Sequence, residues 1–195
     1  MIEGKVIGWA ITGSFCTIPE VFEKIEKIVS DKAKVIPIVS ERVAKMNTRM
    51  GKATDIIEKL EKITGNKVIT DINGAEPIGP KKMLDVLIIL PATGNTIAKM
   101  ANGIIDSSVL MAAKAHMRNG RPLVVAPATN DGLSGSMANI GVLMNRKNVY
   151  FVPYGQDDAI NKPASLIADF GQIVPACEAA LEGKQIQPVL VPINH

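Results

Sequence analysis

The sequence predicts an α/β protein with a doubly wound parallel sheet at the centre of three layers. Apolar runs of strand length alternate along the chain with segments of helical period, and such alternation builds right-handed crossovers between parallel strands. Residues 87–90 and 123–126 are continuous apolar runs rather than alternating ones. Continuous runs are typical of strands that helices cover on both faces.

Each element follows from a local pattern. Strands are expected at residues 5–11, 34–39, 67–70, 85–90, 122–126 and 149–152. Between them, apolar residues recur at intervals of three and four, and Pro19 stands early in the first such segment, where a helix tolerates proline. The clearest helical segments are residues 19–29, 56–63 and 109–116.

The composition is that of a globular protein. With 195 residues the chain is long enough for a substantial core, and its 47% hydrophobic and 21% charged residues oppose disorder. No linker or internal repeat divides it, so we expect a single domain over residues 1–195. The tail, about residues 184–195, carries Pro188 and Pro192 and is expected to run extended over the surface or over a neighbouring subunit.

Charge and cysteine content argue against several functions. The net charge is +3, and lysines alternate with glutamates as on solvated helix faces. Aromatic residues make up 4% of the chain without an interleaved basic cluster, which argues against nucleic acid. The N-terminal apolar run is too short for a membrane span and lacks a cleavage signature. Two cysteines and two histidines without metal-ligand spacing predict no metal site, and we expect a cytoplasmic protein with reduced thiols.

Small, hydroxyl and amide residues follow four of the expected strands. In open α/β sheets a ligand binds beyond the carboxyl ends of the strands, where residues 12–15, 40–42, 91–96 and 127–132 would lie. Any one of these loops is explained as an ordinary helix cap, because Ser, Thr and Asn dominate N-cap positions. Four such loops at one edge of a sheet favour a ligand site.

The residue types in these loops suit an anion. A helix N-terminus has unpaired N–H groups and partial positive charge, while Gly13 would let the backbone approach a phosphate and Ser14 adds a hydroxyl donor. The chain contains neither G-x-x-x-x-G-K-[ST] nor G-x-G-x-x-G. Ser40, rather than an acidic residue, follows the second strand, so a mononucleotide phosphate fits better than a dinucleotide.

Three segments resemble a known family. Residues 12–14, 91–106 and 126–130 are similar to motifs of the flavoproteins called homo-oligomeric flavin-containing cysteine decarboxylases. Residues 91–96 resemble that family's PASANT motif, and residues 127–130 resemble its PxMN motif. The resemblance implies a flavodoxin- or Rossmann-like fold, bound FMN and a homo-oligomer built from trimers.

The resemblance also implies roles for individual residues. Asn95 and Asn130 are implied as catalytic, and Asn130 matches an asparagine that grips a substrate carboxylate in the decarboxylases. The implied cofactor-binding residues are Thr12, Gly13, Ser14, Ser40, Pro91, Ala92, Thr93, Asn95, Thr96, Ala126, Pro127 and Thr129. Of these, Gly13, Ser14 and Ser40 would hold the phosphate, and the last three in the list would line the isoalloxazine pocket.

Within the family, the chain resembles the dipicolinate synthase branch, from residues 7–16 through 130–133 to 161–163. That resemblance implies a flavoprotein subunit that works during sporulation with a separate, dehydrogenase-like A subunit of dipicolinate synthase. Together they would oxidise a small dicarboxylate, a dihydrodipicolinate-derived precursor, to dipicolinate. Two alternatives stay open: an FMN-dependent decarboxylase of a cysteine-containing substrate, and a non-catalytic flavin-binding scaffold.

The chain departs from the family pattern at specific positions. The decarboxylases carry a histidine base in the segment that corresponds to residues 71–77, which contain none here. Gly94 stands where alanine is usual, and Thr129 stands where methionine is usual. His116 is expected to be a partly exposed helix residue rather than a base, and His195 is the last residue of the chain.

Other reactive residues have simpler explanations. Cys16 is better explained as a small buried residue than as a redox thiol beside a flavin, and Cys177 as a packing residue. Arg42, Lys45 and Arg49 follow the second strand and are within reach of an anionic ligand, although basic residues are common on surface helices.

Overall fold

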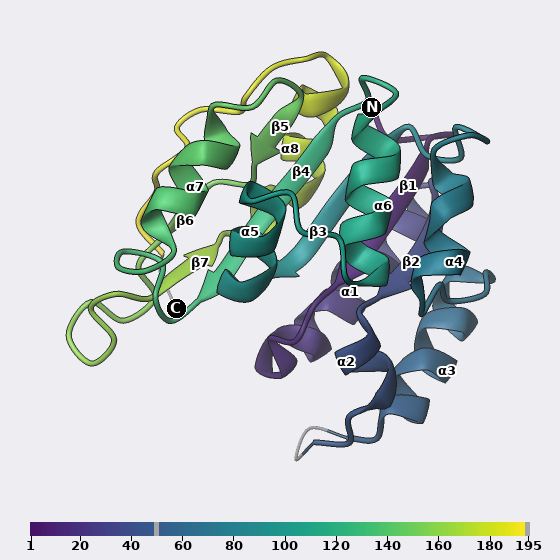
Figure 1. Ribbon diagram of the computed structural model, residues 1–195, viewed down its shortest axis with the longest axis horizontal. Helices are drawn as coiled ribbons and strands as arrows, with labels where there is room; N and C mark the ends of the chain where they lie inside the picture. Colours follow the sequence, from purple (N-terminus) through teal and green to yellow (C-terminus); the bar gives the residue numbers. More distant parts are fainter. Residues whose placement is uncertain (49–50, 194–195) are drawn as a thin grey trace.

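The computed structural model describes residues 1–48 and 51–193 and has one sheet between two helical layers (Figure 1). The strands are β1 (Val6–Ile11), β2 (Lys34–Val39), β3 (Val86–Ala92), β4 (Leu123–Thr129), β5 (Val149–Phe151), β6 (Tyr154–Gly155) and β7 (Leu166–Ala168). The α-helices are α1 (Ile18–Ser30), α2 (Glu41–Lys45), α3 (Ala53–Thr64), α4 (Ile72–Ala75), α5 (Gly94–Ala101), α6 (Ser108–Met117), α7 (Met137–Met144) and α8 (Ile173–Leu181).

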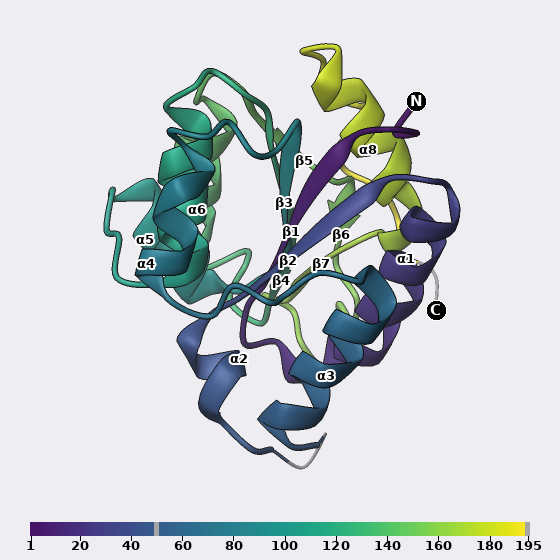
Figure 2. The same cartoon turned by 90° about the vertical axis from the view of Figure 1, so that its right-hand side faces the viewer.

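The predicted three-layer α/β architecture is confirmed. Figure 2 shows α1, α3 and α8 on one face of the sheet and α4, α5 and α6 on the other. All seven residues of β3 are buried, which is the burial expected of a strand covered on both faces. The helices predicted at residues 19–29, 56–63 and 109–116 are present as α1, α3 and α6.

The strand order places a topological switch point between β1 and β3. The path through the sheet is β2-β1-β3-β4-β7-β6, with β5 pairing parallel to the first half of β4. The chain therefore leaves β1 for β2 on one side and returns to β3 on the other. The parallel order β2-β1-β3-β4-β5 is that of flavodoxin-like sheets, in which ligands bind at this switch point.

Two local expectations require correction. Residues 67–70 do not form a strand, because only Ile69 makes a bridge, to Ile38. β3 and β4 extend further than predicted, so Pro91 and Ala92, and likewise residues 127–129, lie within strands rather than in the loops that follow. The pairing of β3 with β4 continues past Pro91 through a register shift, which periodicity does not predict.

A short antiparallel unit closes one side of the sheet. β7 pairs antiparallel with the end of β4 and with β6, and neither β6 nor β7 was predicted. The tail adds to it, since the Tyr154 N–H donates to the Val189 carbonyl at 3.0 Å and the Val191 N–H donates to the Tyr154 carbonyl at 3.1 Å. The tail thus runs extended along β6. None of the helices in the described parts of the chain has the length and apolar character needed to cross a membrane.

Candidate cofactor site at the strand ends

Thr12 joins the two strands that flank the switch point. Its buried hydroxyl donates to the Pro91 carbonyl at 2.6 Å and accepts from the Thr93 N–H at 3.1 Å. A hydroxyl used in this way holds the ends of β1 and β3 in a fixed relation. The side chain of Thr12 therefore builds the site rather than offering a free donor to a ligand.

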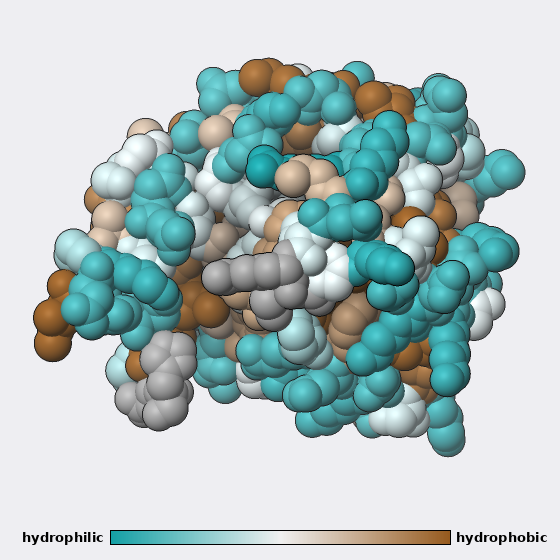
Figure 3. All heavy atoms as spheres, turned by 90° about the horizontal axis from the view of Figure 1, so that it is seen from below, coloured by the Kyte–Doolittle hydropathy of each residue, from teal (hydrophilic) through white to brown (hydrophobic). Residues whose placement is uncertain are grey.

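Two hollows lie at these strand ends, and they share Gly13 and Thr93. The hollow on the β2 side, here the β2-side hollow, has a volume of about 470 Å³. The hollow on the β7 side, here the β7-side hollow, also measures about 470 Å³. Each volume is in the range of small-molecule sites. Figure 3, which views the molecule from the end where the strands terminate, shows mainly hydrophilic residues around this face.

The charges in the β2-side hollow leave one cation available. Lys99 is paired with Asp106 at 2.5 Å, and the Glu41 carboxylate accepts the Ser108 N–H at 3.0 Å, at the start of α6. That contact already offsets the positive end of α6. Arg42 is exposed and makes no ion pair with any described residue. Its guanidinium is therefore free to bind an anion.

The N-terminus of α5 opens into the same hollow. Thr93 is the N-cap, and its hydroxyl accepts the Thr96 N–H at 3.4 Å. The Asn95 N–H, in the first turn, donates to no residue of the described chain, and the Asn95 side chain is exposed. The open first-turn amide favours a negatively charged ligand at this end of α5, where the Asp131 carboxylate beside Gly94 already offsets part of the helix dipole.

Gly13 lies between the two hollows, beside Arg42. A Cβ at position 13 would make ordinary contacts, 3.5 Å from Arg42 Cδ and 3.7 Å from the Phe15 ring. The fold itself therefore has room for a side chain at position 13. Ser14 is half-buried, and its hydroxyl lies 3.8 Å from the Cys16 sulfur.

The β7-side hollow has a different character. Phe15, Ala128, Leu166 and Ile167 supply apolar wall, so this half suits a flat aromatic ring better than a phosphate. Its polar residues include Asn130, Asp131, Asp157, Lys162 and Ser165.

A cluster of oxygens stands at the wall of this hollow. Asp131 Oδ1 accepts hydrogen bonds from the Thr129 hydroxyl and, at 2.9 Å, from the Ser136 hydroxyl. These bonds, the Thr129 one first, lower the pKa of Asp131 below its usual value. Because hydrogen bonds to the charged form favour it, Asp131 is a carboxylate at neutral pH.

Comparisons with known proteins show the family of this chain. The family model described as Flavoprotein matches residues 1–177. The chain belongs to the flavoprotein family. It is 45% identical to the B subunit of dipicolinate synthase from Bacillus subtilis (strain 168) over 97% of this chain and 95% of that protein.

Solved structures agree with the fold of this flavoprotein. The crystal structure of the dipicolinate synthase B subunit from Bacillus halodurans matches with a TM-score of 0.90 and 44% identity, over 98% of each chain. The FMN-dependent cysteine decarboxylase SpaF matches with a TM-score of 0.67 and 21% identity, over 93% of this chain and 99% of that one. The first likeness extends to the sequence, and the second concerns the fold alone.

In the structure of the flavoprotein, the predicted site residues are divided between the two hollows, and four of them lie inside strands. Thr12, Gly13, Ser40, Thr93, Asn95 and Thr96 line the β2-side hollow, and Gly13, Ser14, Thr93, Thr129 and Asn130 line the β7-side hollow. The two predicted catalytic residues, Asn95 and Asn130, thus lie in different hollows. Pro91, Ala92, Ala126 and Pro127 are buried within β3 and β4 and line neither hollow. Arg49 and His195 lie outside the described residues.

Two expectations about reactive side chains are wrong. Cys16 is exposed and lines the β7-side hollow, so it is not a buried packing residue. His116 is buried rather than partly exposed, and its Nε2 lies 2.9 Å from the Pro122 carbonyl. The packing role of Cys177 is confirmed, because it is fully buried and burial raises the pKa of its thiol to about 12.

Sequence reasoning missed the residues that the β6–β7 unit contributes. Asp157, Lys162 and Ser165 reach the β7-side hollow because β7 folds back against the end of β4. The only signal for this loop in the sequence is the similarity of residues 161–163 to the dipicolinate synthase branch. No local pattern predicts that β7 returns antiparallel to β4. Among the described residues, no group of three or more His, Cys, Asp and Glu side chains is placed to hold a metal.

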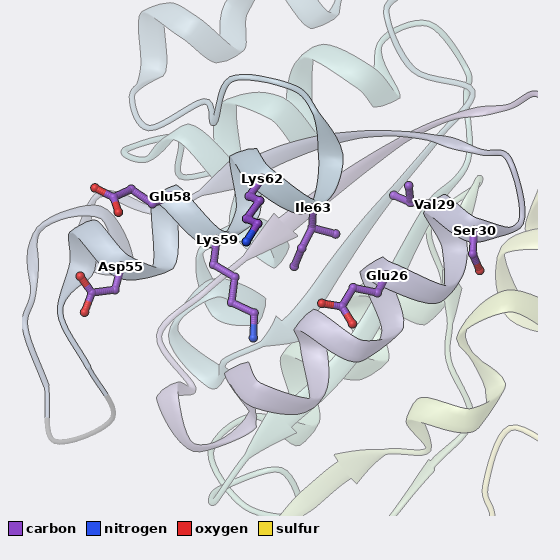
Figure 4. A pocket seen from close by; sticks show the side chains of 8 residues that line it. All are labelled: Glu26, Val29, Ser30, Asp55, Glu58, Lys59, Lys62 and Ile63. Atoms are coloured by element: carbon purple, nitrogen blue, oxygen red, sulfur yellow. The ribbon is translucent and has the colours of Figure 1, made fainter.

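The flavoprotein has a larger hollow elsewhere, of about 720 Å³, between α1 and α3 (Figure 4). Glu26 and Lys59 extend into the gap between the helices, over an apolar floor of Val29 and Ile63. Lys59 also stacks on the Phe22 ring, with its Nζ 4.3 Å from the ring centroid. This groove lies on a helical face and away from the strand ends, so it does not belong to the candidate site.

Proposed function

We propose that this chain binds FMN at the strand ends and acts as the flavoprotein subunit of a dipicolinate synthase. The phosphate would lie in the β2-side hollow and the isoalloxazine ring in the β7-side hollow. The observation that carries this assignment is the meeting of Arg42 and the α5 N-terminus in one hollow at the switch point, beside a second hollow with apolar walls. The similarity to the dipicolinate synthase B subunit of B. subtilis and the name of the FMN-dependent decarboxylase SpaF support it.

The residues present fit such a cofactor. Arg42 and the Asn95 N–H would hold the phosphate, with Gly13 allowing close approach of the backbone and Ser40 adding a hydroxyl. Phe15 and the β7 residues would cover the ring and exclude water from it. When bound, FMN supplies an acceptor for hydride. The reaction class would be the oxidation of a cyclic dicarboxylate, and Asn130, which is exposed and lines the β7-side hollow, would grip a substrate carboxylate.

Flavin titration tests the assignment of the phosphate. Gly13→Asp places a carboxylate beside Arg42 and in the path of the phosphate, while the free space at position 13 keeps the fold intact. We expect Gly13→Asp to weaken FMN binding at least about tenfold, which corresponds to about 1.4 kcal/mol, and to weaken riboflavin much less. The measurement is flavin fluorescence quenching, together with the visible spectrum of the purified protein.

Gly13→Ala is the matched control, because it adds the same Cβ without a charge and should retain FMN. A Gly13→Asp protein that binds FMN as tightly as the wild type contradicts the phosphate assignment. The proposed function fails altogether if the purified wild type is colourless and added FMN gives it no thermal stabilisation.

We also propose two kinds of partner: the dehydrogenase-like A subunit of dipicolinate synthase, and further copies of this chain in a trimer-based oligomer. Leu133, Met137, Val142 and Met144 are between 39% and 47% exposed on and beside α7, a helix without a charged residue. Exposed apolar side chains gathered in this way are typical of interfaces. Light scattering on the purified chain tests self-association, and a monomeric mass contradicts it.

The alternatives make different predictions. A decarboxylase of a cysteine-containing substrate would release carbon dioxide from a peptidyl or pantothenoyl cysteine. Residues 71–77 supply no histidine to such a reaction, and His116 is buried against a carbonyl. A non-catalytic scaffold would keep its partner active after Asn95→Ala and Asn130→Ala, whereas a catalytic subunit would lose turnover.

A further inference from the structure

Asp131 lines the β7-side hollow, and one of its two carboxylate oxygens takes both of the hydroxyl bonds that hold the side chain. Both hydroxyls that hold the side chain, from Thr129 and Ser136, bond to Oδ1. No side chain of the described residues donates a hydrogen bond to Oδ2. Asp131 is exposed and lines the hollow. One oxygen thus anchors the carboxylate, and the other is available to a ligand.

Gly94 provides the space for this arrangement. A Cβ at position 94 would lie 2.7 Å from each of three oxygens: Asp131 Oδ1, Thr129 Oγ1 and Ser136 Oγ. Since real Cβ atoms do not approach oxygens so closely, a side chain at this position would displace the cluster. Gly94 and Thr129, two of the positions that differ from the motifs the sequence resembles, are therefore in contact with the same Asp131 carboxylate.

The charges of the hollow are complementary to a ligand with both a donor and an acid group. Asp131 is ionised and accepts hydrogen bonds only, and its position against the first residue of α5 places its negative charge at the positive end of that helix. Lys162, paired with Asp157 at 3.6 Å, lines the same hollow and carries a positive charge. An N–H on the ligand suits the Asp131 carboxylate, and a carboxylate on the ligand would share Lys162 with Asp157.

We propose that Asp131 binds a heterocyclic N–H group in the β7-side hollow, and that Gly94, Thr129 and Ser136 are the positioning residues that hold it there. The inference rests on the proposed function. It narrows the substrate class to cyclic dicarboxylates whose ring nitrogen carries hydrogen. The flavin ring is a second source of the same chemistry, and the experiment separates the two.

The test uses full-length protein loaded with FMN and two dicarboxylates that carry their carboxylates at the same 2,6 positions of a six-membered nitrogen ring. Piperidine-2,6-dicarboxylate carries hydrogen on its ring nitrogen, whereas pyridine-2,6-dicarboxylate does not. Binding of each is followed through the absorbance of the bound flavin. We expect Asp131→Asn to weaken the piperidine compound about tenfold and to leave the pyridine compound unchanged or bound more tightly, because a repelling charge is gone.

Gly94→Ala tests the positioning role without changing the carboxylate. The added methyl group should displace Asp131 and shift selectivity between the two dicarboxylates in the same direction. Glu23→Gln is the control, because it removes one exposed negative charge on α1, away from both hollows. Glu23→Gln should leave the affinity for each dicarboxylate unchanged. A weakened fold would lower both affinities together, so a changed ratio between them in Gly94→Ala reports the position of Asp131.

The remaining outcomes are distinguishable. If Asp131→Asn weakens FMN and riboflavin alike and leaves selectivity between the dicarboxylates unchanged, the N–H belongs to the flavin. If the wild type binds FMN and the Asp131→Asn variant matches it for all four ligands, the inference is overturned while the proposed function stands. If the wild type binds no FMN, the proposed function itself fails.

Discussion

At the scale of single residues, His116 is a buried group whose charge state matters to stability. It is 1% exposed, and burial is the main cause that lowers its pKa to about 4. At neutral pH the imidazole is therefore uncharged, and Nε2–H donates to the carbonyl of Pro122 at the start of β4. An imidazole in this state ties α6 to the sheet, because its Nε2–H is used in that hydrogen bond.

This burial predicts a pH dependence of stability. Between pH 6.5 and 4 the unfolded chain protonates His116 while the folded chain does not, so acidification favours unfolding by up to about 1.4 kcal/mol per pH unit. The loss begins below pH 6.5 and ends near pH 4, where the folded state also takes up the proton. His116→Gln keeps a donor and removes the titration. Urea unfolding at about pH 7, 6 and 5 should show a flatter slope for the variant, and equal slopes contradict the assignment.

At the scale of elements, glycines in β1 and α7 have opposite environments. A Cβ on Gly8, in the middle of β1, would overlap Leu84 Cδ1 and lie 2.8 Å from Leu87 Cδ1. Gly141, within α7, has no atom within 4 Å of the same position. The packing around β1 thus requires glycine at position 8, whereas the packing around α7 does not require glycine at position 141.

The same substitution should therefore change stability in opposite directions. Gly8→Ala overpacks the core and should cost about 1–3 kcal/mol. Gly141→Ala should stabilise by about 0.5–1 kcal/mol, because alanine loses less backbone freedom in a helix. Denaturant unfolding of both variants measures the difference. A neutral Gly8→Ala would show that the two leucines move aside at little cost.

At the scale of the whole molecule, the C-terminal tail completes the edge of the sheet. The side-chain amide of Gln185 accepts the Phe151 N–H at 2.8 Å and donates to the Phe151 carbonyl at 2.8 Å. One side chain thus supplies the two hydrogen bonds that a neighbouring strand would make to β5. Further along, Val189 and Val191 pair with Tyr154 of β6.

Removing this amide should loosen the β5–β6 edge. Gln185→Ala leaves two backbone groups of a buried residue without partners, which should cost about 1–3 kcal/mol. Amide exchange should accelerate at Phe151 and Tyr154, as measured by hydrogen exchange with mass spectrometry. Gln187→Ala is the matched control, because that exposed side chain accepts one hydrogen bond, from the Val189 N–H, among the residues that the structure describes. Equal exchange in both variants contradicts a role for Gln185.

Local patterns predicted most elements of the fold. They failed where backbone pairing with another strand determines whether a segment is a strand and where it ends. Apolar runs of strand length marked β1 to β5, and intervals of three and four marked α1, α3 and α6. The extension of β3 through Pro91, the single bridge at Ile69 and the antiparallel return of β7 depend on which backbone lies alongside. A short window of sequence contains no information about that neighbour.

The sequence by itself determined that this is an α/β protein with hydroxyl- and glycine-rich strand ends, and it carried the motifs that mark the family. The tertiary structure alone decided how those ends divide into two hollows. It set Thr12 against Pro91 and brought Gly94 against Asp131. The physical reason is that residue types and periodicity follow from chain-local forces, whereas contacts between distant residues follow from strand order, register and the direction of each side chain.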